Sequence, residues 1–558
     1  MLADESVDPQ FGTGLMMACT FGDREDVLKW RRHGLPLRLA LEPDGRLGPL
    51  AGRFAGLPVT EARAAVARAL AEAGALAGSE PVRQAAGVHE RCRTPVEFQI
   101  RPQWFVAVRA HAGRFRARAA ELDWIPPFMR RRLEDWIDGL KWDWNISRQR
   151  RYGVPFPVWL CCSCSAPVLA RPGDLPVDPL ADPPPVPACP RCGCADLAGD
   201  PDVMDTWMTS SLSPQINDGW ACGGSDPALA PMSMRVQGAD IIRTWLFYTL
   251  VQSELHFGRL PWRTALVSGL GLSEQGRPLS KRDLAGSGGY NRYVPDDVMA
   301  RYGADALRLW AATGRMGTDL RYHEKQVRTG RKLAVKLWNA GRFLSLHLDG
   351  FDPAGPPPDP GERDLVDRWL LSHLADAVTE ATAAFEAHDY MRAYQAASRM
   401  FWPVYCDRYL EMIKDRVSDA AARWTLWESY RVLLGLFAPF APFVTEHMYQ
   451  RLYRPGEQAV SLHLTRWPAV DERWRGDRTA GDRLAAILDA IRVLRAGLRL
   501  GNSARLGTVV LQPDGAAAAA TCDQIAEPLR VAARADAVAR GPAHHPSGVP
   551  GIAVAIAV

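Results

Sequence analysis

Two pairs of cysteines have the spacing of a metal site. Cys161 and Cys164 are separated by two residues, and Cys189 and Cys192 repeat this spacing. Four thiolates suit the tetrahedral coordination of Zn²⁺. The 24 residues between the pairs include eight prolines. We expect such a segment to bury little apolar surface and to need a crosslink, such as a bound metal, to hold it in place. The spacing predicts a structural zinc, and the alternative is a knuckle that has lost its metal.

The remaining cysteines have weaker signals. Cys162 and Cys194 are neighbours of the two pairs and compete with them as possible ligands. Eleven cysteines in 558 residues are too sparse for a disulfide scaffold. We expect the other five to be buried small hydrophobes or inert thiols. These five are Cys19, Cys92, Cys222, Cys406 and Cys522.

Two further segments have residues that could contact a nucleotide. Residues 276–282 read GRPLSKR and follow a predicted strand, so Lys281 could meet a phosphate as a point charge. The alternative is a solvated basic turn. Asp240 follows Gly238 at the start of a predicted helix. Its carboxylate could cap that helix or accept hydrogen bonds from ribose hydroxyls.

Charge is also concentrated at two predicted helices. Asp23 and Asp26 stand three residues apart at a helix start, which puts both carboxylates on one face. They either complement the helix dipole or bind an ammonium group or a water. Residues 326–343 contain no acid, which suits an RNA backbone or a solvated face. The basic residues of this helix are Arg328, Arg331, Lys332, Lys336 and Arg342.

The elements that must position these residues change along the chain. Residues 88–160 are mixed, whereas residues 201–320 alternate helix and strand, which predicts a parallel α/β unit. The expected strands are 11–19, 96–100, 104–108 and 263–269, and the expected helices are 59–75, 129–140, 240–252 and 295–302.

From residue 321 the pattern is helical, as in an antiparallel bundle. The expected helices are 325–347, 364–387, 390–416, 421–437 and 441–453, with tryptophans in the bundle core. A small tail follows, with a helix at 480–499, a strand at 508–512, an alanine-rich helix and a last strand at 552–558.

The overall composition is that of a globular protein. Hydrophobic residues make up 47% and charged residues 23%, which excludes collagen, coiled coil and general disorder. The net charge of +4 permits a nucleic-acid partner without requiring one. A run of about 18 apolar residues is absent, and the first 20 residues lack the basic residues of a secretory signal, so no membrane span is expected.

Taken together, the segments resemble the valine members of the class I aminoacyl-tRNA synthetases, in their archaeal-like form. The resemblance covers residues 9–470 in family order. The strings that carry it are FGTG (11–14), CTFGD (19–23), HERC (89–92), WDWNISRQR (142–150), YGVPFPVW (152–159), DVMDTW (202–207), DIIRTWLFY (240–248), YGADALR (302–308), KLWN (336–339) and YCDRYLE (405–411).

This resemblance implies a domain order and a set of sites. Residues 1–87 would be the C-terminal part of a β-rich editing insertion. Residues 88–320 would be the second half of a Rossmann catalytic domain, with the zinc knuckle at 159–200. Residues 321–470 would form the anticodon-binding bundle, and 471–558 a small α/β appendage. The implied reaction is the ATP- and Mg²⁺-dependent attachment of valine to tRNA(Val) in the cytoplasm, without a role for DNA or a membrane.

The resemblance also implies roles for single residues. Ser280 and Lys281 match the centre of the family's signature loop, whose second lysine stabilises the leaving pyrophosphate. Asp240 and Gly238 would face the adenylate, and Trp207 the amino-acid pocket. The implied editing residues are Thr13, Asp23 and Asp26, and the implied tRNA-binding residues are Arg328, Arg331, Lys332 and Lys336.

Some family features are missing from the sequence. The His-Ile-Gly-His string that holds ATP phosphates does not occur, and Pro278, Arg282 and Ala239 replace the family's Lys, Ser and His. We therefore expect a fragment, or one part of a split ligase that works with a separate N-terminal half. The alternatives are a non-catalytic tRNA-binding paralogue and a paralogue repurposed for biosynthesis with valine or valyl-tRNA.

Overall fold

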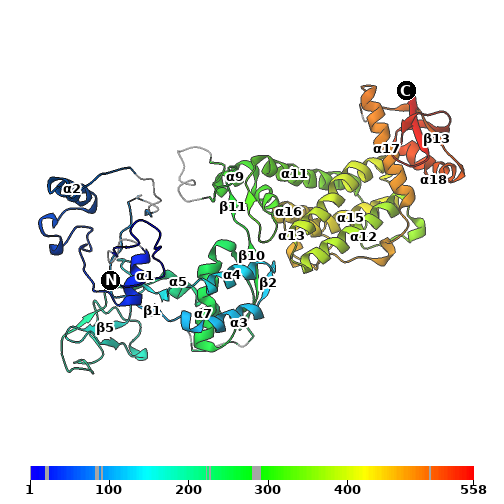
Figure 1. The fold of residues 1–558 in the computed structure, drawn as a ribbon. Coiled ribbons are helices and arrows are strands. Elements are labelled where there is room, and N and C mark those ends of the chain that lie inside the picture. The colour runs from blue at the N-terminus through cyan, green and yellow to red at the C-terminus, as the bar shows by residue number, and fades with distance from the viewer. Residues whose placement is uncertain are drawn as a thin grey trace. The chain divides into compact units, whose positions relative to one another are not determined.

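The computed structural model describes residues 2–18, 24–81, 87–89, 92, 94–220, 223, 224, 226, 228–279, 291–501 and 504–557. The chain divides into two compact units. One contains residues 1–106, 144–150 and 200–203, and the other contains 107–143, 151–199 and 204–558 (Figure 1). Among the described residues, no helix is both long and apolar enough to cross a membrane.

The first unit is mainly helix and loop. Its elements are α1 (Arg24–His33), the 3₁₀ helix η1 (Pro49–Phe54), α2 (Val59–Glu72), β1 (Phe105–Val106), β3 (Trp144–Asn145) and β4 (Ser147–Arg148). The helix predicted at 59–75 is confirmed by α2. Strands β1 and β3 pair antiparallel, so the strand predicted at 104–108 is formed in its central two residues.

Two predicted strands of this unit are wrong. Residues 11–18 form turns and loop, and the side chain of Phe11 is 81% exposed. The backbone there bonds locally, with Phe11 N–H donating to the Asp8 carbonyl and Gly14 N–H to the Phe11 carbonyl. Residues 96–100 are likewise loop and exposed. An apolar run forms a strand only when a neighbouring strand satisfies its backbone, and the described residues 2–81 contain no strand.

A three-stranded parallel sheet lies at the centre of the α/β region. Strand β10 (Trp262–Ser268) lies between β2 (Asp123–Ile125) and β9 (Met232–Gly238), and both pairs are parallel. The strand predicted at 263–269 and the parallel α/β unit are confirmed. The helices of this region are α3 (Ala112–Glu121), α4 (Met129–Asp138) and α7 (Phe247–Phe257), and α4 confirms the helix predicted at 129–140.

Helices α3 and α7 are joined by a buried acidic group. Glu254 of α7 is 4% exposed and accepts from the guanidinium groups of Arg114 and Arg118 at 2.6–2.9 Å. Beside this ion pair, the rings of Phe115 and Phe247 meet edge to face. These contacts hold α7 against α3. Because η5 and η6 connect β9 directly to α7, the same contacts position this connection.

Shorter elements surround the sheet. They are β8 (Val203–Met204), α5 (Thr206–Ser210), α6 (Ser213–Asn217), η5 (Ala239–Ile241), the π-helix η6 (Ile242–Leu246), β11 (Gly271–Leu272), α9 (Pro295–Tyr302), α10 (Ala304–Ala311) and β12 (Leu320–Arg321). The helix predicted at 240–252 is therefore a continuous helical segment made of η5, η6 and most of α7, and α9 matches its prediction. Strands β11 and β12 pair in parallel.

The cysteine-rich segment forms its own small antiparallel sheet. Its strands are β5 (Val158–Cys161), β6 (Pro167–Leu169) and β7 (Leu197–Gly199), in the order β6-β5-β7. A 3₁₀ turn, η3 (Pro172–Asp174), lies in the proline-rich loop. Trp159 and Val168 are among the buried side chains of this sheet.

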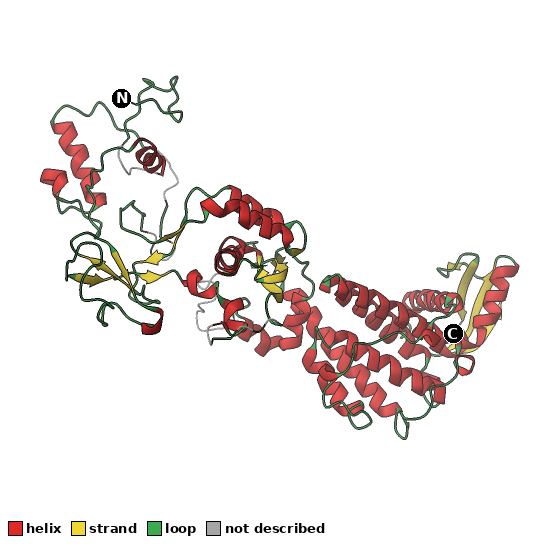
Figure 2. Cartoon of the chain, turned by 90° about the horizontal axis from the view of Figure 1, so that it is seen from below, coloured by secondary structure: helices red, strands yellow, loops and turns green. Residues whose placement is uncertain are grey.

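The following region is the predicted helical bundle (Figure 2). Its elements are α11 (Glu324–His347), η7 (Pro360–Glu362), α12 (Leu365–Glu386), α13 (Tyr390–Arg399), the π-helix η8 (Met400–Tyr409), α14 (Leu410–Met412), η9 (Lys414–Arg416), α15 (Ala420–Phe437) and α16 (Pro442–Leu452). The buried core includes Trp369, and further tryptophans pack against it, which confirms the predicted structural role of the bundle tryptophans. They include Trp338, Trp402, Trp424 and Trp427.

The tail is a small α/β layer. Its elements are η10 (Leu462–Leu464), η11 (Glu472–Trp474), α17 (Thr479–Gly497), β13 (Leu506–Pro513), α18 (Ala516–Ala532), β14 (Ala535–Arg540), β15 (His545–Pro546) and β16 (Ile552–Ala557). The sheet order is β14-β13-β16-β15. Strand β14 was not expected from the sequence, because its alternating apolar residues are mostly alanine.

Candidate active site and metal centre

The carboxyl end of β9 positions the first candidate group. Gly238 ends this strand and caps the following turn η5, and the exposed carboxylate of Asp240 lies in that turn. A Cβ at position 238 would lie 2.5 Å from Asp240 Oδ1, so a side chain there would displace this carboxylate. The N-cap residue is Gly238, so Asp240 lies two residues too late for the capping role considered from the sequence.

The neighbouring helix α5 positions Trp207. Asp205 caps this helix by accepting from the Trp207 backbone N–H at 3.4 Å, and the Trp207 side chain is half-buried. Trp245, in the π-helix that follows Asp240, donates its indole N–H to the Ser210 carbonyl at 3.0 Å. This hydrogen bond joins α5, which carries Trp207, to the helical segment that carries Asp240. π-Helices are frequent at functional sites.

The loop after β10 is the third part of this region. Strand β10 ends at Ser268, opposite Gly238 in the register, so the two loops leave the same carboxyl edge of the sheet. In open α/β sheets, ligands bind at such an edge. The loop is ordered by hydrogen bonds from Ser273 N–H to the Arg277 carbonyl and from Gly276 N–H to the Ser273 carbonyl. Ser280 and Lys281, the predicted centre of the loop, lie outside the described residues.

Sequence reasoning missed a buried cation on the same strand. Arg235 of β9 is 5% exposed and its guanidinium lies over the rings of Trp245 and Trp262. Burial lowers the pKa of Arg235 to about 9. Gln237, two residues on, is equally buried. The alternation of side chains along a strand could have placed both on one face. The burial of Arg235, however, depends on Trp245 and Trp262, which the fold brings to its guanidinium group.

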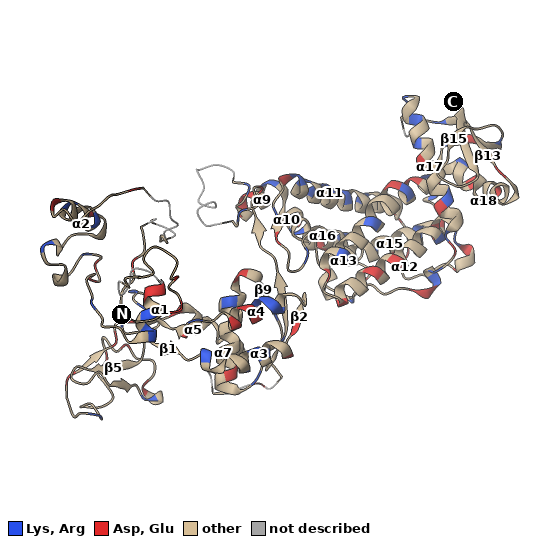
Figure 3. Cartoon of the chain, viewed as in Figure 1, with Lys and Arg blue, Asp and Glu red and all other residues tan. Residues whose placement is uncertain are grey.

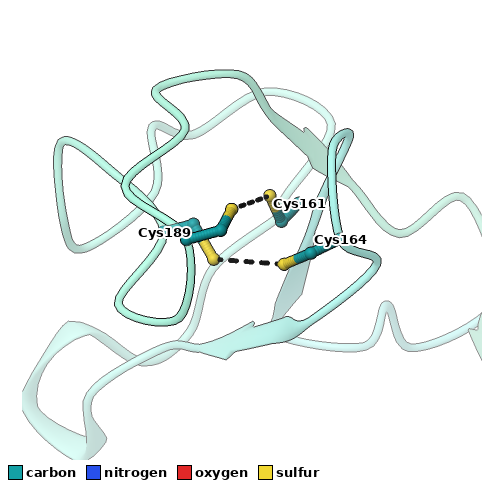
Figure 4. Close-up of side chains that lie close together, drawn as sticks. Cys161, Cys164 and Cys189 are labelled. Carbon is teal, nitrogen blue, oxygen red and sulfur yellow. Dashed lines mark hydrogen bonds between the residues drawn. The ribbon is translucent and has the colours of Figure 1, made fainter.

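The four predicted zinc ligands come together in space. The sulfur atoms of Cys161 and Cys192 are 3.5 Å apart, and those of Cys164 and Cys189 are 3.7 Å apart (Figure 4). All four lie within 4.8 Å of one another. Tetrahedral Zn–S bonds of about 2.3 Å place ligand sulfurs about 3.8 Å apart, so the cluster has the size that zinc requires.

Tight turns of the knuckle place a backbone donor beside the Cys161 thiolate. The Ser165 N–H donates to the Cys161 carbonyl and the Gly193 N–H to the Cys189 carbonyl, so each cysteine pair closes a tight turn. A hydrogen bond from the Cys164 backbone N–H lowers the pKa of Cys161 to about 6. These residues would hold Zn²⁺ as a closed structural site, which supplies a crosslink and no open coordination position.

Other cysteines do not join the cluster. Cys162 is exposed, and Cys194 lies apart from the four-sulfur group. Cys406 and Cys522 are buried, as predicted. Cys92 contradicts its prediction, because it is exposed and its Sγ lies 3.2 Å from His89 Nδ1. The hydrogen bond with the Thr94 hydroxyl lowers the pKa of Cys92 to about 7. Cys19 and Cys222 lie outside the described residues.

The predicted editing residues lie in different surroundings. Thr13 is exposed in a turn, where its hydroxyl accepts from the Leu15 backbone N–H. Asp26 lies in the first turn of α1 and is 7% exposed. Asp23 precedes that helix and lies outside the described residues.

Helix α11 carries the predicted basic surface (Figure 3). Arg328 and Lys332 are one turn apart and exposed. Arg331 is also exposed, and its Nη1 donates to the Arg301 carbonyl at 3.1 Å. Lys336 differs from the prediction, because it pairs with Asp407 and its ammonium lies 4.4 Å from the centre of the Trp402 ring. A lysine neutralised in this way contributes little to an RNA-binding surface.

Comparison with known protein families assigns the chain to a class of enzymes. The model for class I tRNA synthetases (I, L, M and V) matches residues 23–169 and 181–323, which is more than half of the chain. The model for the anticodon-binding domain of tRNA ligases matches residues 367–510. The chain therefore belongs to the class I tRNA synthetases, with a catalytic α/β region followed by a helical anticodon-binding domain.

Individual relatives of this chain include two archaeal valine–tRNA ligases. A valine–tRNA ligase from Methanopyrus kandleri is 41% identical over 92% of this chain and 56% of its own length. One from Thermoplasma volcanium is 34% identical over 95% of this chain and 67% of its own length. The solved methionyl-tRNA synthetase of Mycobacterium tuberculosis has a TM-score of 0.47 at 20% identity, covering 68% of this chain and 69% of that one. The chain spans a little over half the length of the first of these relatives.

Proposed function

We propose that the chain acts in the ATP-dependent attachment of valine to tRNA(Val). The observation that carries this proposal is the 41% identity to a valine–tRNA ligase over 92% of the chain. The site supports it, because Asp240 and the loop after β10 leave the same edge of a parallel sheet. Charging of tRNA would take place in the cytoplasm, with Mg²⁺ bound to the ATP.

The proposed division of labour follows the chain. Residues 1–87 belong to an editing insertion, 88–320 to the catalytic domain, 321–470 to the anticodon-binding bundle, and 471–558 to an appendage. In the catalytic part, Asp240 and Gly238 meet the adenylate and Trp207 borders the amino-acid pocket. Ser280 and Lys281 stabilise the departing pyrophosphate. Thr13, Asp23 and Asp26 are the proposed editing residues.

Activation of valine needs more donors than these. The carboxylate oxygen of valine attacks the α-phosphorus of ATP and pyrophosphate leaves, so charge develops around the phosphates and must be met from several sides. The sequence contains no His-Ile-Gly-His string to supply donors opposite Lys281. Loss of one preorganised donor costs about 3–4 kcal/mol of transition-state stabilisation. We therefore propose that the chain works with a separate polypeptide that supplies the other donors.

Valine-dependent exchange of pyrophosphate into ATP tests this proposal. The assay compares the chain alone with the chain plus a polypeptide covering the part of the Methanopyrus kandleri relative that it does not match. We expect exchange near background alone and clear exchange with the added polypeptide. Lys281→Ala should abolish the restored exchange, and Lys325→Ala, at an exposed lysine of α11, is the matched control.

Two results would contradict the proposal. Strong exchange by the chain alone would show that one side of the site is sufficient. Failure to exchange even with the added polypeptide would favour a non-catalytic tRNA-binding role. That second function is supported by the exposed pair Arg328 and Lys332 on α11, and direct binding of a tRNA(Val) transcript would separate it from complete loss of function.

A further inference from the structure

A polar cavity lies where the bundle meets the tail. It has a volume of about 550 Å³ and is bordered by η8, α14 and η9 on one side and by α17 and the end of α18 on the other. This volume is in the range of pockets that hold a small ligand or a single nucleotide. The charged side chains that line it are Asp407, Arg408, Glu411, Lys414, Arg492, Arg495 and Arg534.

The cavity has an excess of positive charge. Five of the charged lining residues are basic and two are acidic. Asp489, outside the lining, bridges Arg408 and Arg492 at 2.7 and 2.8 Å, while Asp407 is shared with Lys336. Including these two flanking residues, the excess remains three positive charges. The lining of the cavity therefore carries an excess of cationic side chains.

The most buried of these cations is held in a fixed position. Arg495 is 5% exposed, and its Nη2 donates to the carbonyls of Ala533 at 2.6 Å and Ala504 at 2.8 Å. Burial, followed by the charges of Arg534 and Arg492, lowers the pKa of Arg495. The protein thus places like charges together in a cavity, and an anion bound there would relieve their repulsion.

Arg534 occupies a backbone position that usually favours glycine. It follows α18 with a φ of +50°, in the left-handed region that disfavours side chains. The residue is nevertheless an exposed arginine that borders the cavity. Lys414 enters from the opposite side, where it pairs with Glu411 at 2.6 Å.

We propose that this cavity binds a backbone phosphate of tRNA and holds one nucleotide of the bound strand. The inference rests on the proposed function, because it assumes that tRNA is the ligand of the bundle. Guanidinium and ammonium groups are the usual partners of phosphate. The lining contains no aromatic side chain on which a base could stack. The contact therefore positions the strand without reading its sequence.

The test uses exposed or half-buried residues whose loss leaves the buried Arg495 intact. The double variant Lys414→Gln/Arg534→Gln removes two cations from the cavity. The matched control, Arg505→Gln/Arg540→Gln, removes two exposed cations from the tail that do not line it. Binding of a tRNA(Val) transcript to the full chain is measured by fluorescence anisotropy over a series of KCl concentrations. Thermal unfolding by circular dichroism checks that both variants are folded.

We expect the cavity variant to bind tRNA about tenfold or more weakly, since hydrogen bonds to charged groups are lost. The slope of log affinity against log salt should fall by about one, for the single phosphate contact that is lost, and the loss should be the same for a non-cognate tRNA. The control variant should bind with a slope close to that of the natural chain.

Three results would overturn the inference. If the natural chain binds tRNA and the cavity and control variants have equal salt slopes, the cavity is not part of the tRNA-binding site. The proposed function would not be affected by that result. A changed affinity for pyrophosphate alone, with tRNA binding unaltered, would assign the cavity to a free anion. Absence of tRNA binding by the natural chain would reject tRNA binding as the chain's function, and this inference with it.

Discussion

Removal of two thiolates from the cysteine cluster should abolish zinc binding. The variant is Cys161→Ser/Cys189→Ser, which takes one ligand from each pair. The matched control is Cys162→Ser, because Cys162 is adjacent in sequence, exposed, and outside the four-sulfur group. Both variants exchange sulfur for oxygen in the same knuckle, so a difference between them reports on metal ligation.

The size of the effect follows from the geometry. The two closest sulfur pairs are 3.5 and 3.7 Å apart, within a few tenths of an ångström of the separation that tetrahedral zinc imposes. Little rearrangement opposes binding, so the full affinity of a structural site is expected, with an apparent free energy of about 10–16 kcal/mol at neutral pH. Two remaining thiolates cannot close a four-coordinate site, and the variant should lose nearly all of its zinc.

Metal analysis of protein purified without chelator is the assay. We expect about one equivalent of zinc in the natural chain and in Cys162→Ser, and almost none in the double variant. Limited proteolysis should cut the double variant within the proline-rich loop, because the knuckle buries few apolar side chains. Unchanged zinc content in the double variant, or equal loss in the control, would refute the assignment.

Zinc binding at the same site should also depend on pH. The pKa of Cys161 is lowered from 9.0 to about 6 by the Cys164 backbone N–H, so the fold favours the thiolate of this residue. Its contribution to stability is complete above pH 9 and is lost as the pH falls toward 6. Protons compete with Zn²⁺ for this thiolate only below its pKa of about 6, so zinc release should increase as the pH falls below that value, and retention that is independent of pH would contradict the thiolate assignment.

Four further variants probe the helical region and the tail. Arg328→Gln with Lys332→Gln should weaken tRNA binding and lower its salt slope by about two, and an unchanged slope would remove α11 from the binding surface. Asp305→Ala should destabilise the fold by about 1–2 kcal/mol in urea unfolding, because this carboxylate accepts from two backbone N–H groups at the start of α16; an unchanged midpoint would contradict that role. Gly330→Ala should cost about 1–3 kcal/mol, since its Cβ would lie 2.7 Å from a backbone oxygen of α10. Gly497→Ala, with open space around it, should be neutral or stabilising by about 0.5–1 kcal/mol, and equal effects of the two glycine changes would refute the packing argument.

Local patterns were sufficient for much of the fold. The periodicity of residues 325–347 and 295–302 predicted α11 and α9 almost to the residue. The spacing of Cys161, Cys164, Cys189 and Cys192 predicted the sulfur cluster. These features depend on neighbours within a few positions of each other, or on pairs of such groups.

Strands required information that local patterns do not contain. Residues 11–18 are apolar enough for a strand, yet they form turns, because strand formation depends on a distant partner for the backbone. Conversely, the alanine-rich β14 has a weak strand pattern and forms because β13 pairs with it in parallel. Similar amino acids can therefore satisfy their backbone hydrogen-bonding groups either in local turns or by pairing with a distant strand.

The sequence by itself determined the chemistry that is available: four thiols with metal spacing, an acid-free helix, and a carboxylate after Gly238. Tertiary structure decided which of these groups are free to act. It paired Lys336 with Asp407, buried Arg235 between two tryptophans, and exposed Asp240. It also assembled the basic cavity from three segments that lie within residues 406–414, 488–495 and 532–534. The physical reason is that charge, burial and hydrogen bonding depend on distance in space, which chain folding sets and local sequence does not.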